Sequence, residues 1–195
     1  MKEYYDKRAA EYDDWYLGRG LFEPRDRAGW DAELQRLFSV ISGLTPGRTL
    51  DVACGTGFLT RHLRGDVVAL DQSARMLEEA HRQAPSATIV QGDAFALPFV
   101  DQAFDRVVTC HFYGHLEPPE RARFLAEARR VAKELVVVDA SRKHSGIDEH
   151  MSTRVLNDGS SWEVYKRYFT GAGLAGELGD GEVLFEGEYF VVVHA

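Results

Sequence analysis

The sequence predicts an α/β protein, a three-layer sandwich on a mixed sheet of about seven strands. Three observations lead to this prediction. From about residue 46, short apolar runs alternate regularly with helical segments. The run Leu135–Asp139 is apolar enough for a central strand buried on both faces. The last two apolar runs are separated only by Glu186-Gly187-Glu188, which predicts an antiparallel hairpin at one edge of the sheet.

The expected elements follow in chain order. The first forty-odd residues are helical, because Tyr5, Ala9, Tyr12 and Tyr16 recur at helical spacing and a second helix opens after Pro24. Strands are expected at Thr49–Ala53, Val67–Leu70, Thr88–Val90, Phe104–Cys110 and Leu135–Asp139, with helices at Phe58–Leu63, Ala74–Gln83 and about Pro119–Lys133. After these we expect an irregular polar stretch at Arg142–Asn157 and strands at Trp162–Phe169, Val183–Phe185 and Tyr189–Val193.

Size, charge and composition limit the class of protein. The 195 residues fit one domain, 1–195, in which residues 1–45 form a helical extension and residues 46–195 the sheet core. No stretch has the roughly 18 apolar residues of a membrane helix, and the N-terminus lacks the apolar core of a signal peptide, so we expect a cytoplasmic protein without a membrane partner. The net charge of -8 argues against a nucleic-acid partner. Cys54 and Cys110 are too few for a disulfide scaffold.

Two loops that follow strands indicate a cofactor containing a nucleoside. Cys54-Gly55-Thr56-Gly57 allows a sharp turn and a close approach of the backbone to a ligand. Asp71 ends the second strand, where a carboxylate can accept both hydrogen bonds of a ribose diol, although capping of the helix near Ser73 is the alternative. Thr60 stands where a dinucleotide loop has its third glycine, and the loop carries no basic residue. A cofactor without phosphates therefore fits better.

Four segments in order resemble the motifs of class I S-adenosylmethionine (SAM)-dependent methyltransferases, which have a Rossmann-like fold. They are Leu50–Gly57, Ala69–Ser73 with Met76 and Leu77, Gln91–Ala94, and Phe104–Val108. The resemblance spans about residues 45–140 and implies SAM as cofactor and S-adenosylhomocysteine (SAH) as product. One departure is Ala53, where many relatives have a glycine.

The resemblance implies a role for each matching residue. The residues it assigns to the cofactor are Tyr5, Tyr12, Asp51, Ala53, Gly55, Gly57, Asp71, Gln72, Met76, Asp93, Ala94 and Thr109. Among them, Ala53, Gly55 and Gly57 would pack under the methionine part, and Asp51 would hold its ammonium group directly or through water. Asp71 would bind the ribose. The adenine would lie between Gln72 and Met76, with Asp93 accepting its amino group and the Ala94 amide meeting a ring nitrogen.

The N-terminal segment resembles starts of the form Tyr-Asp-x-x-Ala-x-x-Tyr-Asp, which fold over the cofactor as a lid. Tyr5 and Tyr12 are its first and last tyrosines. Aromatic rings can stabilise a cationic sulfur by cation-π attraction of about 0.5 to 2 kcal/mol. Packing of these rings on the sheet is the alternative.

The loop after the fourth strand, His111-Phe112-Tyr113-Gly114-His115, carries the candidate catalytic residues. If the acceptor must lose a proton, His111 or His115 could act as general base and Tyr113 could orient the acceptor. A hydrogen bond from His115 to backbone is the alternative. The two histidines have the spacing of metal ligands on a helix, but Gly114 disfavours a helix there, and no metal site is predicted.

We therefore expect an enzyme that transfers a methyl group from SAM to an O, N, S or C nucleophile of a small molecule. The alternatives are a methyltransferase acting on protein or RNA and a non-catalytic SAM-binding subunit. A nicotinamide-dependent reductase would need a Tyr-x-x-x-Lys pair, which this chain lacks. Residues 142–157 and 162–169 are expected to shape the acceptor pocket, while the acceptor itself and the oligomeric state stay open.

Overall fold

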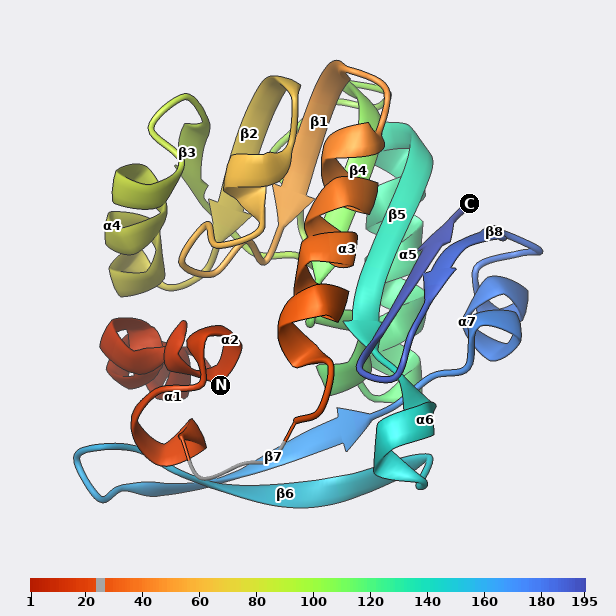
Figure 1. Ribbon diagram of the computed structural model, residues 1–195. Helices are drawn as coiled ribbons and strands as arrows, with labels where there is room; N and C mark the ends of the chain where they lie inside the picture. The colour runs from red at the N-terminus through yellow and green to blue at the C-terminus, as the bar shows by residue number, and fades with distance from the viewer. Residues whose placement is uncertain (24–26) are drawn as a thin grey trace.

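The computed structural model describes residues 1–23 and 27–195 and has a main sheet of seven strands (Figure 1). The strand order is β3-β2-β1-β4-β5-β9-β8. Five strands are parallel: β1 (Gly47–Val52), β2 (Gly65–Asp71), β3 (Thr88–Gln91), β4 (Phe104–Cys110) and β5 (Ala132–Ala140). The hairpin of β8 (Glu182–Glu186) and β9 (Phe190–His194) adds two antiparallel strands beside β5. The predicted mixed sheet with an antiparallel C-terminal edge is confirmed.

Helices cover both faces of this sheet, and β5 is buried between them. The helix α3 (Trp30–Gly43) lies on one face and α5 (Pro118–Val131) on the other, while α4 (Ala74–Gln83) follows β2 and α7 (Gly171–Glu177) lies next to the C-terminal hairpin (Figure 1). Val136 and Val138 of β5 belong to the core under α3, whereas Val137 belongs to the core under α5. This alternation confirms the prediction of a central strand buried on both faces. None of the helices in the described residues is long and apolar enough to cross a membrane.

The N-terminal helical region is divided into short pieces. It comprises α1 (Lys2–Arg8), a 3-10 turn at Ala9–Glu11 and α2 (Asp14–Leu17), which Gly18 ends in the left-handed conformation. The predicted helix start at Pro24 lies outside the described residues. The helix α3 begins only at Trp30.

The predicted helix Phe58–Leu63 is wrong. Only a single 3-10 turn forms there, at Thr60–His62. The chain leaves the glycine turn at Gly57 and enters β2 at Gly65, so the residues between them are too few for an α-helix of two turns with its caps.

The expectation of an irregular stretch at Arg142–Asn157 is also wrong. This region forms α6 (Arg142–Ser145) and β6 (Glu149–Val155), and β6 pairs with β7 (Ser161–Arg167) in a separate antiparallel hairpin below the main sheet (Figure 1). Alternate residues of β6 are exposed and half-buried, as a strand with one solvated face requires. The pattern escapes sequence analysis because its inward residues, His150, Ser152 and Arg154, are polar.

Candidate active site

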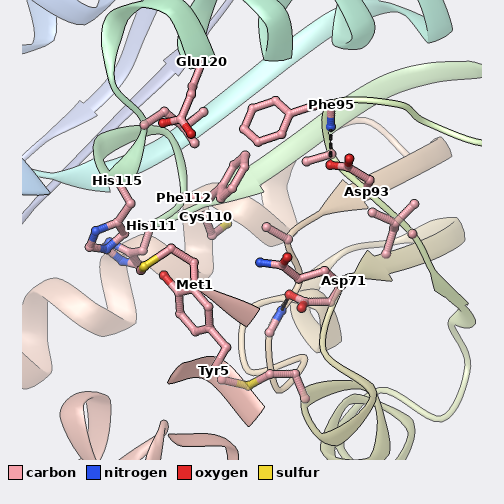
Figure 2. Close-up of a pocket in the computed structure, with 18 of the residues that line it drawn as sticks. Met1, Tyr5, Asp71, Asp93, Phe95, Cys110, His111, Phe112, His115 and Glu120 are labelled. Carbon is pink, nitrogen blue, oxygen red and sulfur yellow. Dashed lines mark hydrogen bonds between the residues drawn. The ribbon is translucent and has the colours of Figure 1, made fainter. Parts of the chain in front are cut away.

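The carboxyl ends of β1, β2, β3 and β4 open onto a cavity of about 190 Å³, which we call the inner cavity (Figure 2). It lies where the strand order reverses between β1 and β4, the place where open α/β sheets bind ligands. Nine of the twelve residues assigned to the cofactor line it: Tyr5, Tyr12, Ala53, Gly55, Asp71, Gln72, Met76, Asp93 and Ala94. Residues distant in sequence are thus brought to one place.

Asp71 anchors the turn that forms the floor of the inner cavity. Its Oδ2 accepts a hydrogen bond from the Gly55 amide at 3.0 Å and its Oδ1 one from the Ser73 amide at 2.9 Å. Each carboxylate oxygen keeps a lone pair for a further donor. The alternative role of Asp71 as helix cap is excluded, because the cap of α4 is Ser73, whose Oγ accepts from the Met76 amide at 3.1 Å.

The glycine turn is built from residues in the left-handed conformation. Ala53, Gly55 and Gly57 have φ of +59°, +56° and +76°. A Cβ on Gly57 would lie 3.0 Å from the Cα of Ala80 in α4, so this glycine lets the turn pack closely against that helix and does not itself line the cavity. Ala53 adopts the same conformation at the cost of strain.

Asp51 lies beneath the turn and has one oxygen without a hydrogen-bond partner. The hydroxyl of Thr60 donates to its Oδ2 at 2.6 Å, while its buried Oδ1 has none among the described residues. Burial raises the pKa of the Asp51 carboxyl to about 7, with repulsion from Asp71 adding to the rise and the Thr60 hydrogen bond opposing it. A buried carboxyl with a vacant oxygen suits a cationic group nearby.

Asp93 and two phenylalanines form the far side of the inner cavity (Figure 2). The Asp93 Oδ1 accepts a hydrogen bond from the Phe95 amide at 2.9 Å, which leaves its Oδ2 for a ligand. The rings of Phe95 and Phe112 lie 6.2 Å apart. These two rings are not among the residues predicted for the site. Phe95 directly follows Ala94 of the third motif, and Phe112 directly follows His111.

A second cavity of about 410 Å³, the outer cavity, adjoins the inner one. Both cavities share three lining residues, Tyr12, His111 and His115. The remaining walls of the outer cavity come from the N-terminal segment, the start of α3, the end of β5, α6, the β6–β7 hairpin with the residue after it, and the loop before β9. They are Arg8, Trp15, Arg27, Trp30, Ala140, Ser141, His144, Arg154, Lys166, Tyr168 and Tyr189. Its volume lies within the range of small-molecule sites.

His111 and His115 are both neutral at pH 7. Burial lowers the pKa of His111 to about 4 and that of His115 to about 3, and Lys166 lowers both further. The Nδ1 of His115 lies 2.7 Å from the carbonyl of Tyr165, so this nitrogen carries the proton and Nε2 is the acceptor. The alternative of a backbone hydrogen bond for His115 is therefore observed. In His111, Nε2 is buried without a partner among the described residues.

Comparison with known proteins shows what this arrangement is. Residues 49–134 match the family described as a methyltransferase domain. A solved DhpI-SAM-HEP complex is 28% identical, with a TM-score of 0.76 and coverage of 98% of this chain and 94% of that one. The chain belongs to the class I SAM-dependent methyltransferases. SAM is the cofactor of these enzymes.

Two further relatives agree with this family. A demethylmenaquinone methyltransferase from Renibacterium salmoninarum is 36% identical over 148 residues, 72% of this chain and 62% of that protein. The solved DhpI-SAH complex is 28% identical, has a TM-score of 0.70 and is matched over 98% of this chain and 92% of its own. This methyltransferase thus spans about three fifths of the length of the curated relative.

The N-terminal segment of the methyltransferase is tied to the sheet core by two aspartates. Asp13 accepts hydrogen bonds from Thr56 and Gln83, each at 2.5 Å. Asp6 accepts one from the Ser73 hydroxyl, also at 2.5 Å. The N-terminal segment also contacts the β6–β7 hairpin, because the backbone amide of Asn157 donates a hydrogen bond to the Glu11 carboxylate at 2.8 Å. Tyr5 and Tyr12 are thereby held against the inner cavity.

Two residues predicted for the site of this methyltransferase lie elsewhere. Tyr113 is buried in the core beside Phe124, and its hydroxyl donates to Glu177 at 3.4 Å, so it does not line either cavity. Burial and Glu177 raise its pKa to about 12. Thr109 is fully buried and donates to the Val52 carbonyl at 2.8 Å, joining β4 to β1 instead of lining the cavity. Both cysteines are free.

Proposed function

We propose that this chain transfers a methyl group from SAM to a small molecule bound in the outer cavity. The observation that carries the proposal is the pair of adjoining cavities: the inner one holds the family's cofactor residues, and the outer one meets it at Tyr12, His111 and His115. A methyl donor and an acceptor in these two spaces would meet at the shared residues. The β6–β7 hairpin and the N-terminal segment wall the outer cavity, which favours a small molecule over a protein or RNA chain.

The residues of the inner cavity fit SAM. The free lone pairs of Asp71 suit a ribose diol, and the Oδ2 of Asp93 suits an amino group of adenine. The vacant Oδ1 of Asp51 suits the ammonium of the methionine part, directly or through water, above which Ala53 and Gly55 leave room. We assign Gln72, Met76 and the Ala94 amide to the adenine, and Tyr5 and Tyr12 to a lid over the cofactor.

Bound SAM supplies a methyl group that is already electrophilic, so the chain has mainly to align the acceptor and exclude water. Tyr12 contributes to both tasks at the junction of the cavities, and burial raises the pKa of its phenol, which keeps the ring neutral. An acceptor that must lose a proton needs a base at this junction. We assign that role to Nε2 of His111, with His115 as the alternative.

Labelling with methyl-labelled SAM tests the proposal. We expect the purified protein to transfer label into the low-mass fraction of a cell extract, and Asp71→Asn to reduce both this transfer and SAH affinity at least tenfold. Asp66→Asn, on the exposed start of the same strand, should change neither. Label confined to protein or RNA would show a macromolecular acceptor. SAH binding without any transfer would identify a non-catalytic subunit.

A further inference from the structure

The outer cavity is positively charged in a protein that is acidic overall. Four cationic side chains line it: Arg8, Arg27, Arg154 and Lys166. Within residues 1–23 and 27–195, no aspartate or glutamate lines this cavity. The whole chain, in contrast, has a net charge of -8. The cations are therefore concentrated at this site and do not reflect the composition.

Arg8 enters the cavity from the N-terminal helix without a carboxylate partner. Its Nη1 donates to the Tyr4 hydroxyl at 2.6 Å, and its guanidinium lies over the Tyr12 ring, 4.8 Å from the centroid. In the described part of the chain, no carboxylate forms an ion pair with it. These contacts hold the guanidinium in place and leave its charge uncompensated by an anion.

Two further cations come from the inward face of the β6–β7 hairpin. Arg154 on β6 and Lys166 on β7 both point inward, as the burial pattern of the two strands shows. The Lys166 Nζ lies 2.6 Å from Oδ1 of Asp139, a fully buried residue at the end of β5. Burial alone would raise the pKa of this carboxyl, but Lys166 and His111 reverse the effect and lower it. Asp139 stays ionised and balances the charge of Lys166.

The charge of Arg8 would be costly beside a sulfonium unless an anion balances it. A cationic or amine acceptor in the outer cavity would meet like charges on the wall and on the methyl donor, which raises its free energy of binding. His111 and His115 are neutral, so they do not offset the positive charge of the wall. Arginine forks match the oxygens of carboxylate, phosphate and phosphonate groups by paired hydrogen bonds.

We propose that the acceptor carries an oxyanion group, which Arg8 and Arg154 bind in the outer cavity with Lys166 contributing positive charge. The inference rests on the proposed function, because it identifies the chemical class of that acceptor. Trp15, Trp30 and Tyr189 line the rest of the cavity and suit a small apolar body attached to the anion.

Binding of simple probes to the SAH-saturated protein tests this inference. Phenylphosphonate and benzoate carry the two kinds of oxyanion, and benzamide is a neutral analogue of benzoate. Trp15 and Trp30 line the cavity, so tryptophan fluorescence reports binding, with calorimetry as a second measure. We expect at least one anion to bind tenfold or more tightly than benzamide, and the tighter of the two identifies the preferred group. Equal affinity for benzamide and both anions would overturn the inference.

Charge-removing variants locate the anion. We expect Arg8→Met and Arg154→Met each to weaken anion binding at least fivefold and to leave benzamide within twofold, while Arg8→Lys retains part of the affinity. Lys7→Met removes the same charge from the same helix outside the cavity and should change neither. An equal loss in Lys7→Met would attribute the effect to net charge and refute the site. If Arg8→Met fails to fold, Arg154→Met on the separate hairpin decides alone.

The two proposals fail in different ways. A protein that binds no SAH contradicts the proposed methyl transfer. A protein that binds SAH and transfers label, but binds neutral and anionic probes with equal affinity, contradicts only the proposal of an anionic acceptor.

Discussion

Asp51 couples cofactor binding to pH at the scale of a single residue. Its pKa of about 7 in the free protein means that the carboxyl holds a proton over much of the range between pH 5 and 7. The ammonium group assigned to it favours the carboxylate, so binding lowers this pKa and expels the proton. Affinity for SAH should therefore fall as the pH drops below about 7.

Calorimetry in buffers of different ionisation enthalpy checks this sign. At pH 6.5 we expect SAH binding to release part of a proton from the wild-type protein. Asp51→Asn, which keeps the shape but cannot ionise, should abolish the release. Release of the same size in both proteins would place the titrating group elsewhere.

Ala53 stores backbone strain at the floor of the inner cavity. A left-handed conformation costs a non-glycine residue about 1 to 2 kcal/mol, which a change to glycine would remove. Glycine also gives the unfolded chain more conformational freedom, which cancels about 0.4 to 1 kcal/mol of that gain in stability. We expect Ala53→Gly to raise the free energy of unfolding by about 0.5 to 1 kcal/mol, measured by urea denaturation. Gln102→Gly, at φ +56° in the exposed loop before β4, should do the same. Destabilisation by Ala53→Gly alone would show that its methyl group packs favourably.

The sequence predicts which side chains lie at the ends of strands, but it does not predict the direction in which each of them points. Asp71 ends β2 and Asp93 lies two residues after β3, and the sheet brings such positions together. Tyr113 was expected in the site but lies outside it, because the chain reverses locally at His111, which has a φ of +54°. The sequence does not reveal this reversal. Beyond it, the chain turns Tyr113 into the core under α5. Arg8 was missed because a charge on a helix usually faces solvent.

At the scale of elements, the N-terminal segment depends on Asp13. Its carboxylate accepts from the glycine turn through Thr56 and from α4 through Gln83. Hydrogen bonds to a charged group contribute about 1.5 to 3 kcal/mol. Asp13→Ala should therefore loosen the segment and speed SAH dissociation about tenfold, the equivalent of about 1.4 kcal/mol. Stopped-flow fluorescence measures this rate.

The neighbouring aspartate supplies the control for this prediction. Asp14→Ala alters the same short helix without touching Thr56 or Gln83 and should leave the rate within twofold. A rate unchanged in Asp13→Ala would show that the segment does not cover bound SAH.

The β6–β7 hairpin shows where element prediction fails. A strand is recognised when apolar residues alternate with polar ones. Here His150, Ser152 and Arg154 face inward while Met151 and Val155 are exposed, so the usual pattern is inverted. The inversion has a physical reason at Arg154, because this inward side chain lines the polar outer cavity and not an apolar core.

At the scale of the whole molecule, the sheet core and its covering layer differ in buried apolar contacts. Two large clusters hold the main sheet to its helices. Among the described residues, only Tyr4, Leu156 and Val164 form the buried cluster between the N-terminal segment and the hairpin. Regions with few such contacts open at lower free energy.

Hydrogen exchange followed by mass spectrometry should reveal this difference. We expect amides of residues 1–17 and 149–167 to exchange faster than those of β1, β4 and β5, and SAH to slow residues 1–17 more than the central strands. Uniform exchange over the whole chain would contradict a separately opening layer.

The ladder of the β6–β7 hairpin makes the chemistry of the outer cavity sensitive to register. Successive side chains of a strand point to opposite faces, so a single residue deleted ahead of β6 would exchange the two sets. Met151, Thr153 and Val155 would then replace His150, Ser152 and Arg154 on the inward face, and Val155 would stand where Arg154 lines the outer cavity. One deleted codon would thus remove a cationic side chain from the wall of the outer cavity while leaving the cofactor turn untouched. A fold with this geometry can diversify its acceptors by one-residue changes of length next to one hairpin.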